Sequence, residues 1–316
     1  MTSAPAEALL AGLVDYAGLF PPAARPMGEA AAEYARWRRS PEAWMLGRFV
    51  LPAARLGELS RAAPAHLPDA GAGEPWRLSA LLGADTRGDA VLVDSFNRRQ
   101  AGRAVVDAVE LRAGRTAQAV EALDALPSGV AAFVEVPIEA DLPALLAVLK
   151  ARGARAKVRT GGVVPEAIPG PSDLARFLAA SAAASLPFKA TAGLHHPIRA
   201  EHALTYEAGA PRAVLHGFLN VFIAAALARA GAPLADVEAV LRETDGGAFR
   251  FGPDGLRWRD RAVTAADLRA ARSSFALSFG SCSFSEPVDD LGALGILARP
   301  GRPFAASVLA LPREPA

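Results

Sequence analysis

Residues 131–162 read AAFVEVPIEADLPALLAVLKARGARAKVRTGG, and they combine two short β-like runs with one helical run between them. The runs at 131–137 and 156–162 alternate apolar and polar residues, whereas DLPALLAVLK at 141–150 consists mostly of alanine and leucine, which favour helices. A strand, a helix and a second strand in this order are typical of a β-α-β unit, in which the two strands pair in parallel. The stretch therefore indicates a parallel sheet covered by helices.

The same alternation recurs along the chain from Trp44 onward, with roughly 25 to 32 residues between the first candidate strands. One strand and one helix fill this spacing, so we expect an α/β fold, a (β/α)8 TIM-like barrel. A doubly wound sheet would give the same local pattern, and closure of the barrel is the alternative that we favour. The candidate strands are 44–51, 76–83, 106–112, 131–137, 156–162 and 187–193, with two weaker ones near 216–222 and 275–281.

Two segments depart from this regular pattern. Residues 1–43 include DYAGLFPPA and precede the first clear strand, so we expect an N-terminal extension packed on a barrel domain of residues 44–316. The stretch AFRFGPDGLRWRD at 248–260 has two β-like arms around Asp254-Gly255, a pair typical of hairpin turns. It predicts an inserted β-hairpin.

The composition indicates a folded globular protein and argues against several classes of function. The net charge of +1 provides no field for attracting nucleic acid or an anionic membrane. The start of the chain lacks the basic region of a signal peptide, and the apolar run at 219–231 is too short to span a bilayer. We expect a cytoplasmic protein that binds a small anionic molecule, without nucleic-acid or membrane partners, and a homo-oligomer is left open.

Cofactor motifs and cysteine clusters are not found in the sequence. Neither a P-loop nor a dinucleotide fingerprint occurs, and Cys282 is the single cysteine. One thiol makes neither an intrachain disulfide nor a multi-thiolate metal site. The leading interpretation therefore includes no cofactor and no metal.

Charged residues share one face of several expected strands. Since side chains at i and i+2 point to the same face, Glu110 and Arg112 lie opposite the apolar residues of 106–112. Glu135 has the same placement on its strand, as do Lys157 and Arg159 on theirs. We expect these faces to point into the barrel near the carboxyl ends of the strands, where barrel enzymes carry their catalytic groups.

With Lys189 on the following strand, this interior set has two negative and four positive charges. Buried ions are costly unless they are paired, so an anionic substrate would balance the excess. The alternative is an internal salt-bridge network that only fixes the register of the strands.

Lysine is rare in this chain, because only Lys150, Lys157 and Lys189 occur among 34 basic residues. Lys150 ends a helical run, where a cation suits the helix C-terminus. The other two lie inside expected strands. Among other cations and apolar walls the pKa of a lysine falls, and its amine becomes a nucleophile or a base, which arginine cannot become.

Three fragments, KVRTGG at 157–162, FKATAG at 188–193 and FGSCS at 279–283, resemble successive motifs of 2-deoxyribose-5-phosphate aldolase. That family is a Schiff-base barrel of the class I aldolase superfamily, and the order of its motifs is kept. The resemblance implies that Lys157 forms the imine and that Lys189 lowers its pKa. It further implies backbone turns at Thr160, Gly161 and Gly193 beside the imine, and a phosphate loop that contains Gly280, Cys282 and Ser283.

The chain also departs from that family. Arg159 and His195 stand where the family has a small hydroxyl residue and an arginine, and the upstream aspartate that moves protons has only Glu135 as a positional substitute. VDAVELR at 106–112 also resembles the Glu-x-Arg strand of type I 3-dehydroquinate dehydratase, another Schiff-base barrel. Together the resemblances suggest a superfamily more than a substrate.

Two adjacent histidines follow the strand that carries Lys189. We expect His195 and His196 in a loop at the barrel mouth, where one of them acts as an acid or base or contacts the substrate. Metal binding with Glu110 or Glu135 and a purely structural role are the alternatives. His216 and Asn220 are expected in the core, and His66 and His202 in solvent.

Three hypotheses for function follow from these residues. The leading one is an aldolase or related lyase that forms an imine on Lys157 with a small anionic carbonyl compound, helped by Lys189, Glu110, Glu135 or His195. The second is a metal-assisted lyase or isomerase on the same barrel. The third is a barrel that binds an anionic metabolite without catalysis. Cys282 is a nucleophile or, by the interpretation that we favour, a buried residue or part of an anion-binding loop.

Overall fold

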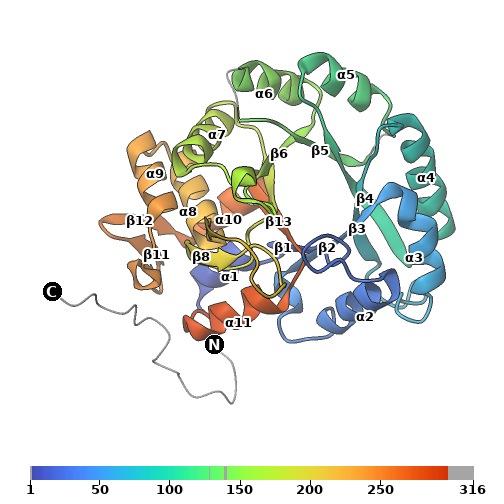
Figure 1. Cartoon of the computed structure of the whole chain (residues 1–316), viewed down its shortest axis with the longest axis horizontal. Helices are drawn as coiled ribbons and strands as arrows, with labels where there is room; N and C mark the ends of the chain where they lie inside the picture. Colours follow the sequence, from blue (N-terminus) through green and yellow to red (C-terminus); the bar gives the residue numbers. More distant parts are fainter. Residues whose placement is uncertain (1, 128, 139–140, 298–316) are drawn as a thin grey trace.

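Eight parallel strands form a closed barrel in the computed structural model, which describes residues 2–127, 129–138 and 141–297 (Figure 1). Neighbouring strands are hydrogen-bonded around the barrel in the order β1-β13-β7-β6-β5-β4-β3-β2. The expected (β/α)8 architecture is therefore confirmed. The barrel strands are β1 (Val14–Tyr16), β2 (Leu46–Pro52), β3 (Trp76–Leu81), β4 (Ala104–Arg112), β5 (Ala131–Glu135), β6 (Arg155–Arg159), β7 (Phe188–Thr191) and β13 (Ala276–Ser281).

Helices surround the outside of the barrel (Figure 1). Within the described ranges, no helix combines the length and apolar character needed to cross a membrane. The helices are α1 (Ala4–Leu10), α2 (Met27–Trp37), α3 (Leu56–Ala62), α4 (Thr86–Arg99), α5 (Thr116–Asp124), α6 (Leu142–Ala151), α7 (Pro171–Ala183), α8 (Phe218–Arg229), α9 (Leu234–Arg242), α10 (Ala265–Ser274) and α11 (Ser285–Ala293).

Helix α4 shows how local sequence sets these bounds. It begins after Asp85, whose carboxylate accepts the Gly88 N–H at 2.9 Å, and it ends in two arginines that suit the negative end of a helix. Val93 and Phe96, one turn apart, are buried on its inner face. The helix therefore has a capped start, a basic end and one face for the barrel.

The strand expected near 216–222 is wrong, because this stretch begins helix α8. Residues 218–228 are all buried, so the helix is apolar on every side, and a short part of it cannot be told from a buried strand by periodicity. The missing strand is β1, which pairs in parallel with β13 and β2. It lies inside residues 1–43, so the barrel begins before Trp44. At the other end, residues 298–316 of the expected barrel domain lie outside the described residues.

The two helices of the N-terminal segment, α1 and α2, pack against the outside of the barrel. Helix α1 lies against α10, and Tyr34 on α2 packs edge-on against Trp76, with ring centroids 4.8 Å apart. The Tyr34 hydroxyl also donates to the Gly47 carbonyl at 2.8 Å. Aromatic packing and this hydrogen bond fix α2 beside strands β2 and β3.

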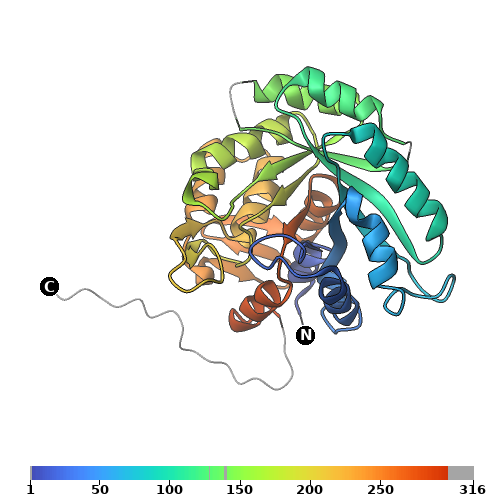
Figure 2. The ribbon, with the colours of Figure 1, turned by 45° about the vertical axis from the view of Figure 1, so that its right-hand side comes forward.

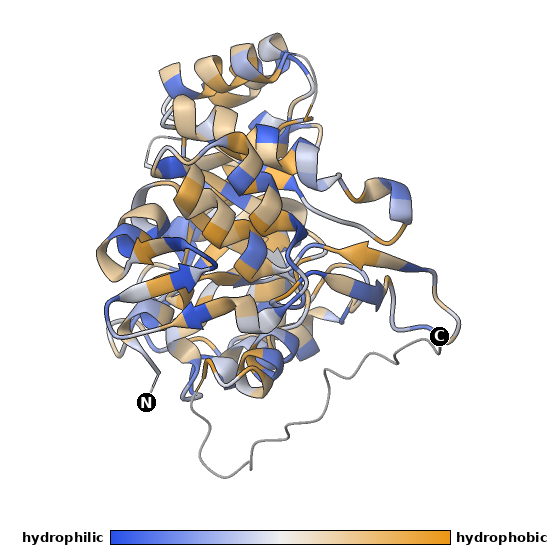
Figure 3. Ribbon diagram, turned by 90° about the vertical axis from the view of Figure 1, so that its left-hand side faces the viewer, coloured by the Kyte–Doolittle hydropathy of each residue, from blue (hydrophilic) through white to orange (hydrophobic). Residues whose placement is uncertain are grey.

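Two small antiparallel sheets are inserted between barrel elements. The expected hairpin at 248–260 is confirmed, and a third strand extends it: β10 (Phe249–Phe251), β11 (Gly255–Trp258) and β12 (Arg261–Thr264). These strands carry both hydrophilic and apolar residues (Figure 3), and along β11 the buried Leu256 and Trp258 flank the exposed Arg257. A second hairpin, β8 (Ala200–Ala203) with β9 (Arg212–Leu215), joins β7 to α8 and lies beside α11 (Figures 1 and 2).

Candidate active site

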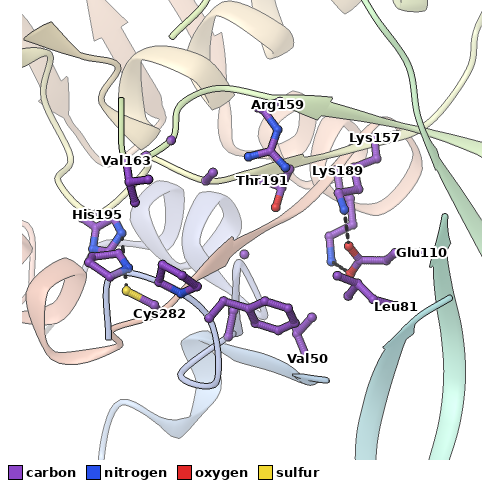
Figure 4. A pocket seen from close by; sticks show the side chains of 18 of the residues that line it. Val50, Leu81, Glu110, Lys157, Arg159, Val163, Lys189, Thr191, His195 and Cys282 are labelled. Atoms are coloured by element: carbon purple, nitrogen blue, oxygen red, sulfur yellow. Dashed lines mark hydrogen bonds and ion pairs between the residues drawn. The ribbon is translucent and has the colours of Figure 1, made fainter. Parts of the chain in front are cut away.

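A cavity of about 710 Å³ opens at the carboxyl ends of the barrel strands (Figure 4). Side chains on β4, β6 and β7 form its floor. Phe20 and Pro21 after β1, and Leu204 and Tyr206 between β8 and β9, form part of its wall. Barrel enzymes carry their active sites at this end of the fold.

The register of the strands brings charged residues together inside the barrel. Glu135 on β5 is level with Lys157 on β6, and Lys157 is level with Lys189 on β7. Side chains at level positions of adjacent parallel strands point to the same face, so these three project into the barrel together. Glu110 on β4 also belongs to this group, because its carboxylate contacts both Lys157 and Lys189.

These residues and Asp15 on β1 form what we call the lysine–carboxylate cluster: Asp15, Glu110, Glu135, Lys157 and Lys189. The Lys157 Nζ lies 2.8 Å from Glu110 Oε2 and 3.0 Å from Glu135 Oε2. The Lys189 Nζ donates to Glu110 Oε1 at 2.6 Å and to Asp15 Oδ2 at 2.7 Å. Glu110 therefore bridges the two lysines (Figure 4).

Neutral donors complete the hydrogen bonds of the buried carboxylates. The Ser79 hydroxyl donates to Glu110 Oε1 at 2.7 Å, and the Ser278 hydroxyl donates to Asp15 Oδ2 at the same distance. The Arg48 backbone N–H donates to Asp15 Oδ1 at 2.8 Å. Buried ions persist when they are paired and hydrogen-bonded in this way.

The charges within the cluster shift each other's protonation equilibria. Burial alone would raise the pKa of Glu110, but the ammonium groups of Lys157 and Lys189 outweigh burial and hold that pKa well below its usual range. Burial alone would lower the pKa of Lys189, but Asp15 and Glu110 outweigh it and raise that pKa. The lowered pKa expected for strand lysines is therefore wrong for Lys189.

Asp15 is the reason for this difference, and the sequence interpretation missed it. The interior was expected to have two carboxylates against four cations, but Asp15 is a third carboxylate and is 1% exposed. It lies in β1, a strand of three residues that the sequence pattern did not reveal. The stretch DYAGLF, an acid in an apolar run, was the available signal.

The two arginines near the cluster occupy different environments. The Arg159 Nε donates to Glu135 Oε1 at 3.1 Å, and its side chain lines the cavity (Figure 4). Arg112 lies 3.4 Å from the same Glu135 oxygen, but its side chain is 75% exposed. Burial alone would raise the pKa of Glu135, but Lys157 and Arg159 outweigh it and lower that pKa. Both arginines line the cavity, and Arg159, at 37% exposed, is the less exposed of the two.

The turns that follow β6 and β7 lie against each other. The Thr160 hydroxyl is buried and donates to the Ala192 carbonyl at 2.6 Å. A Cβ atom at Gly161 would lie 2.8 Å from the Gly193 Cα, and Gly193 itself has a φ of +77°. Glycine is therefore required here by close backbone approach and by a left-handed conformation. Gly193 also lines the cavity.

Cys282 and His195 meet at the cavity wall, where Glu286 and Tyr206 join them. The His195 Nδ1 lies 2.7 Å from Glu286 Oε2, and its Nε2 lies 3.7 Å from the Cys282 sulfur. The Tyr206 hydroxyl donates to Glu286 at 3.1 Å and lies 3.8 Å from the same sulfur. Burial alone would lower the pKa of His195, but hydrogen bonds with Cys282 and Glu286 outweigh it and raise that pKa to about 10.

The sequence interpretation named His195 and Cys282 separately and missed Glu286 and Tyr206. Glu286 is on α11 and Tyr206 is in the β8–β9 hairpin. No local pattern links these segments, so only the fold brings the four residues together. SEPVDD at 285–290, an acidic run at the start of a helix directly after the expected phosphate loop, was the only signal.

His196 also lines the cavity, but its partners differ from those of His195. Its Nδ1 lies 2.6 Å from Asp290 Oδ2, and its ring stacks on His202 with centroids 3.6 Å apart. His202 was expected in solvent, but it is partly buried, and burial with the charge of His196 lowers its pKa to about 4. The core positions expected for His216 and Asn220 are confirmed.

The segment expected to bind phosphate lies at the start of α11. The Ser283 hydroxyl accepts the Glu286 N–H at 3.2 Å, and the Ser283 N–H donates to the Ser281 hydroxyl at 3.3 Å. Gly280 and Cys282 line the cavity. The N–H group of Ser283 is therefore already hydrogen-bonded within the turn.

Metal-binding side chains are not grouped for coordination in this region. Across residues 2–127, 129–138 and 141–297, no three or more His, Cys, Asp or Glu side chains are arranged to hold a metal ion. Comparison with protein-family models and with curated proteins found no match to this chain. The barrel and the geometry of its cavity are therefore the basis for assigning a function.

Proposed function

We propose that the protein is an aldolase or related lyase that forms an imine between Lys157 and a small carbonyl compound with an anionic group. The observation that supports this most directly is the position of the Lys157 amine, on the cavity floor between Glu110 and Glu135. A primary amine beside a carboxylate can pass its proton to that carboxylate and attack a carbonyl carbon, a reaction that is closed to arginine.

Lys157 suits the role of nucleophile better than Lys189. Lys189 is hydrogen-bonded to two carboxylates, which raise its pKa and keep its amine protonated. The Glu135 Oε2 lies 3.0 Å from the Lys157 Nζ but accepts no hydrogen bond of good geometry. Lys157 can therefore leave this contact for a substrate at a lower cost, while Lys189 supplies a fixed positive charge.

Glu135 is the group that moves protons in this proposal. Its side chain is 12% exposed, compared with 3% for Glu110, and its Oε2 has no hydrogen bond to give up. It takes a proton from the Lys157 ammonium, so that the neutral nitrogen can add to the carbonyl carbon. It returns that proton to the carbinolamine hydroxyl, which leaves as water when the imine forms.

Positive charge near the cavity supports an anionic substrate. Arg112, Arg159 and the two lysines of the cluster face three carboxylates, which leaves one positive charge in excess. Arg159 lines the cavity and is 37% exposed, so its guanidinium can contact a bound carboxylate or phosphate.

The resemblance to 2-deoxyribose-5-phosphate aldolase supports the same roles. In that family the two lysines lie on successive strands. Here the lysines of the KVRTGG and FKATAG fragments lie on the adjacent strands β6 and β7. The family also uses an aspartate to move protons, and this chain has no clear counterpart of it in sequence. Two carboxylates that contact Lys157, Glu110 and Glu135, are candidates for that role.

Reductive trapping tests the proposal. The protein is incubated with pyruvate or acetaldehyde and borohydride, and the modified residue is located by mass spectrometry of peptides. We expect an adduct on Lys157 that is absent from Lys157→Met and present in Lys150→Arg, a matched change of a surface lysine. Circular dichroism checks that each variant folds.

The remaining outcomes distinguish the alternatives. An adduct that persists in Lys157→Met would remove Lys157 from the mechanism, and an adduct on Lys189 would exchange the roles of the two lysines. No adduct with any carbonyl compound, together with no turnover, would favour a barrel that only binds its ligand.

A further inference from the structure

Cys282, His195 and Glu286 form a continuous chain of contacts on the cavity wall. Cys282 and His195 lie apart from Lys157, Lys189 and Glu110 (Figure 4). The sulfur faces one nitrogen of the imidazole, and the carboxylate faces the other. A nucleophile, a base and a group that orients the base are arranged in this order in covalent catalysis. The proposed imine chemistry uses none of these three residues.

We propose that Cys282 is a nucleophile that adds to the carbonyl carbon of an aldehyde in the cavity, with His195 as its acid–base partner. Cys282 is 4% exposed, and its side chain lines the cavity rather than the protein surface. Glu286 positions the imidazole through its 2.7 Å contact with Nδ1. These three residues and Tyr206 come from three separate parts of the chain. His195 lies between β7 and β8, Tyr206 lies between β8 and β9, and Cys282 and Glu286 lie around the start of α11.

His195 is placed to serve as the proton donor beside the sulfur. Its Nε2 lies 3.7 Å from the sulfur, and hydrogen bonds with Cys282 and Glu286 raise its pKa, so the imidazole holds a proton that it can give to a bound aldehyde. The Tyr206 hydroxyl, which donates its proton to Glu286, lies 3.8 Å from the sulfur, and Tyr16 on β1 interacts with the sulfur electrostatically. Glu286, the one carboxylate of the wall, contacts His195 and Tyr206.

The proposed step conserves protons and electrons. The thiolate adds to the aldehyde carbon and forms a carbon–sulfur bond, and the electron pair of the carbon–oxygen π bond moves to oxygen. The imidazolium of His195 gives its Nε2 proton to that oxygen. The products are a neutral hemithioacetal and a neutral imidazole, no oxidant is needed, and the reverse reaction releases the aldehyde.

An aldehyde fits this wall better than an ester or thioester. Acyl transfer needs hydrogen-bond donors that are free to hold an oxyanion, and backbone N–H groups beside the nucleophile usually supply them. Here the N–H of Ser283, next to Cys282, already donates to the Ser281 hydroxyl. Addition to an aldehyde needs only one proton, which His195 carries.

If the protein is an aldolase, the two centres would serve two carbonyl groups, and this link rests on the proposed function. Cleavage of a carbon–carbon bond by an aldolase leaves one fragment on the imine nitrogen and releases the other as an aldehyde. Cys282 would hold that second fragment reversibly in the same cavity. The thiol chemistry itself does not require Lys157.

Alkylation with iodoacetamide tests the activated thiol, and since Cys282 is the only cysteine, one mass increment reports on it. We expect the rate constant of the wild type to change little between pH 6 and 8. In His195→Gln it should be at least tenfold lower at pH 6 and rise with pH towards about 8.5, where an ordinary thiol ionises. His202→Gln, which removes a nearby imidazole that does not contact Cys282, should match the wild type. Equal profiles for wild type and His195→Gln would overturn the proposal.

Protection by an aldehyde tests the substrate class in Lys157→Met, where no imine can form at that position. We expect acetaldehyde to slow alkylation of Cys282 in a saturable manner that dilution reverses, and acetate to have no effect. No protection by acetaldehyde, or equal protection by acetate, would contradict covalent capture. This measurement uses a variant that lacks Lys157. Its result therefore does not depend on whether borohydride trapping supports the imine proposal.

Discussion

Lys189 and Asp15, which are 174 positions apart in the chain, form a buried 2.7 Å ion pair inside the barrel. Lys189 is on β7 and Asp15 on β1, and β13 lies between these strands. Ser278 on β13 donates to the same Asp15 oxygen, so three strands meet at one carboxylate. Since β1 is the strand that closes the barrel, closure of the fold and the charge balance of the cavity depend on the same residue.

Asp15→Asn should therefore destabilise the protein strongly. The amide leaves the Lys189 ammonium with one carboxylate in place of two, and removal of one partner from a buried ion pair typically costs about 3 to 5 kcal/mol. Urea unfolding followed by circular dichroism measures this loss. The control Arg98→Ala breaks an exposed pair on α4 and should cost less than about 1 kcal/mol. If both variants lost the same free energy of unfolding, the buried pair would contribute no more to stability than the exposed pair.

The barrel could be predicted from the sequence because most of its strands have a recognisable pattern of alternating residues and a regular spacing. AAFVEVP and AKVRTGG alternate inward and outward residues, and their spacing matches one strand plus one helix. Strand β1 has only three residues, and all of them are buried, so it shows no alternation. The apolar helix α8 has no polar face and was therefore mistaken for a strand. Elements buried on every side lack the pattern that sequence reasoning depends on.

The candidate site could be predicted only in part for a related reason. Glu110, Glu135 and Lys157 lie on recognisable strands, so their common face follows from alternation. The partners of His195 come from α11 and from the β8–β9 hairpin, and nothing in the sequence gives the path of these segments over the cavity. The direction of the Lys189 pKa was wrong because one carboxylate, Asp15, was missing from the count.

Stability should fall in acid because of Glu110. Its pKa is held below the ordinary value of 4.5 in the folded protein, so the stabilisation is fully present above about pH 4.5 and is lost as the pH falls through the lower folded-state value. Urea midpoints between pH 7 and 3 measure the decline. Glu110→Gln should decline less steeply than the wild type, whereas the exposed Glu121→Gln should follow it. Identical slopes in all three proteins would contradict this assignment.

Arg159 should determine the preference for anionic carbonyl compounds. Removing a hydrogen bond to a charged group typically costs about 1.5 to 3 kcal/mol, so Arg159→Met should raise the pyruvate concentration for half-maximal borohydride trapping roughly tenfold or more. The value for neutral acetaldehyde should hardly change. Arg87→Met, on the exposed side of α4, serves as the control. An equal effect on both compounds would mean that Arg159 acts on the cluster rather than on the anion.

Gly161 should tolerate no side chain, because the turns after β6 and β7 touch at this point. A Cβ atom there would lie 2.8 Å from the Gly193 Cα and 3.2 Å from its nitrogen, and backbone atoms cannot rotate away. Gly161→Ala should lose about 1 to 3 kcal/mol, the usual range for overpacking, and should slow trapping on Lys157, which lies on the strand before this turn. Gly28→Ala is the matched control, since an added Cβ on α2 meets nothing within 4 Å. It should be neutral or gain up to about 1 kcal/mol from helix propensity. If Gly161→Ala were as stable as the wild type in urea, the two turns would have room to separate, and the close approach of Gly161 to Gly193 would not exclude a side chain.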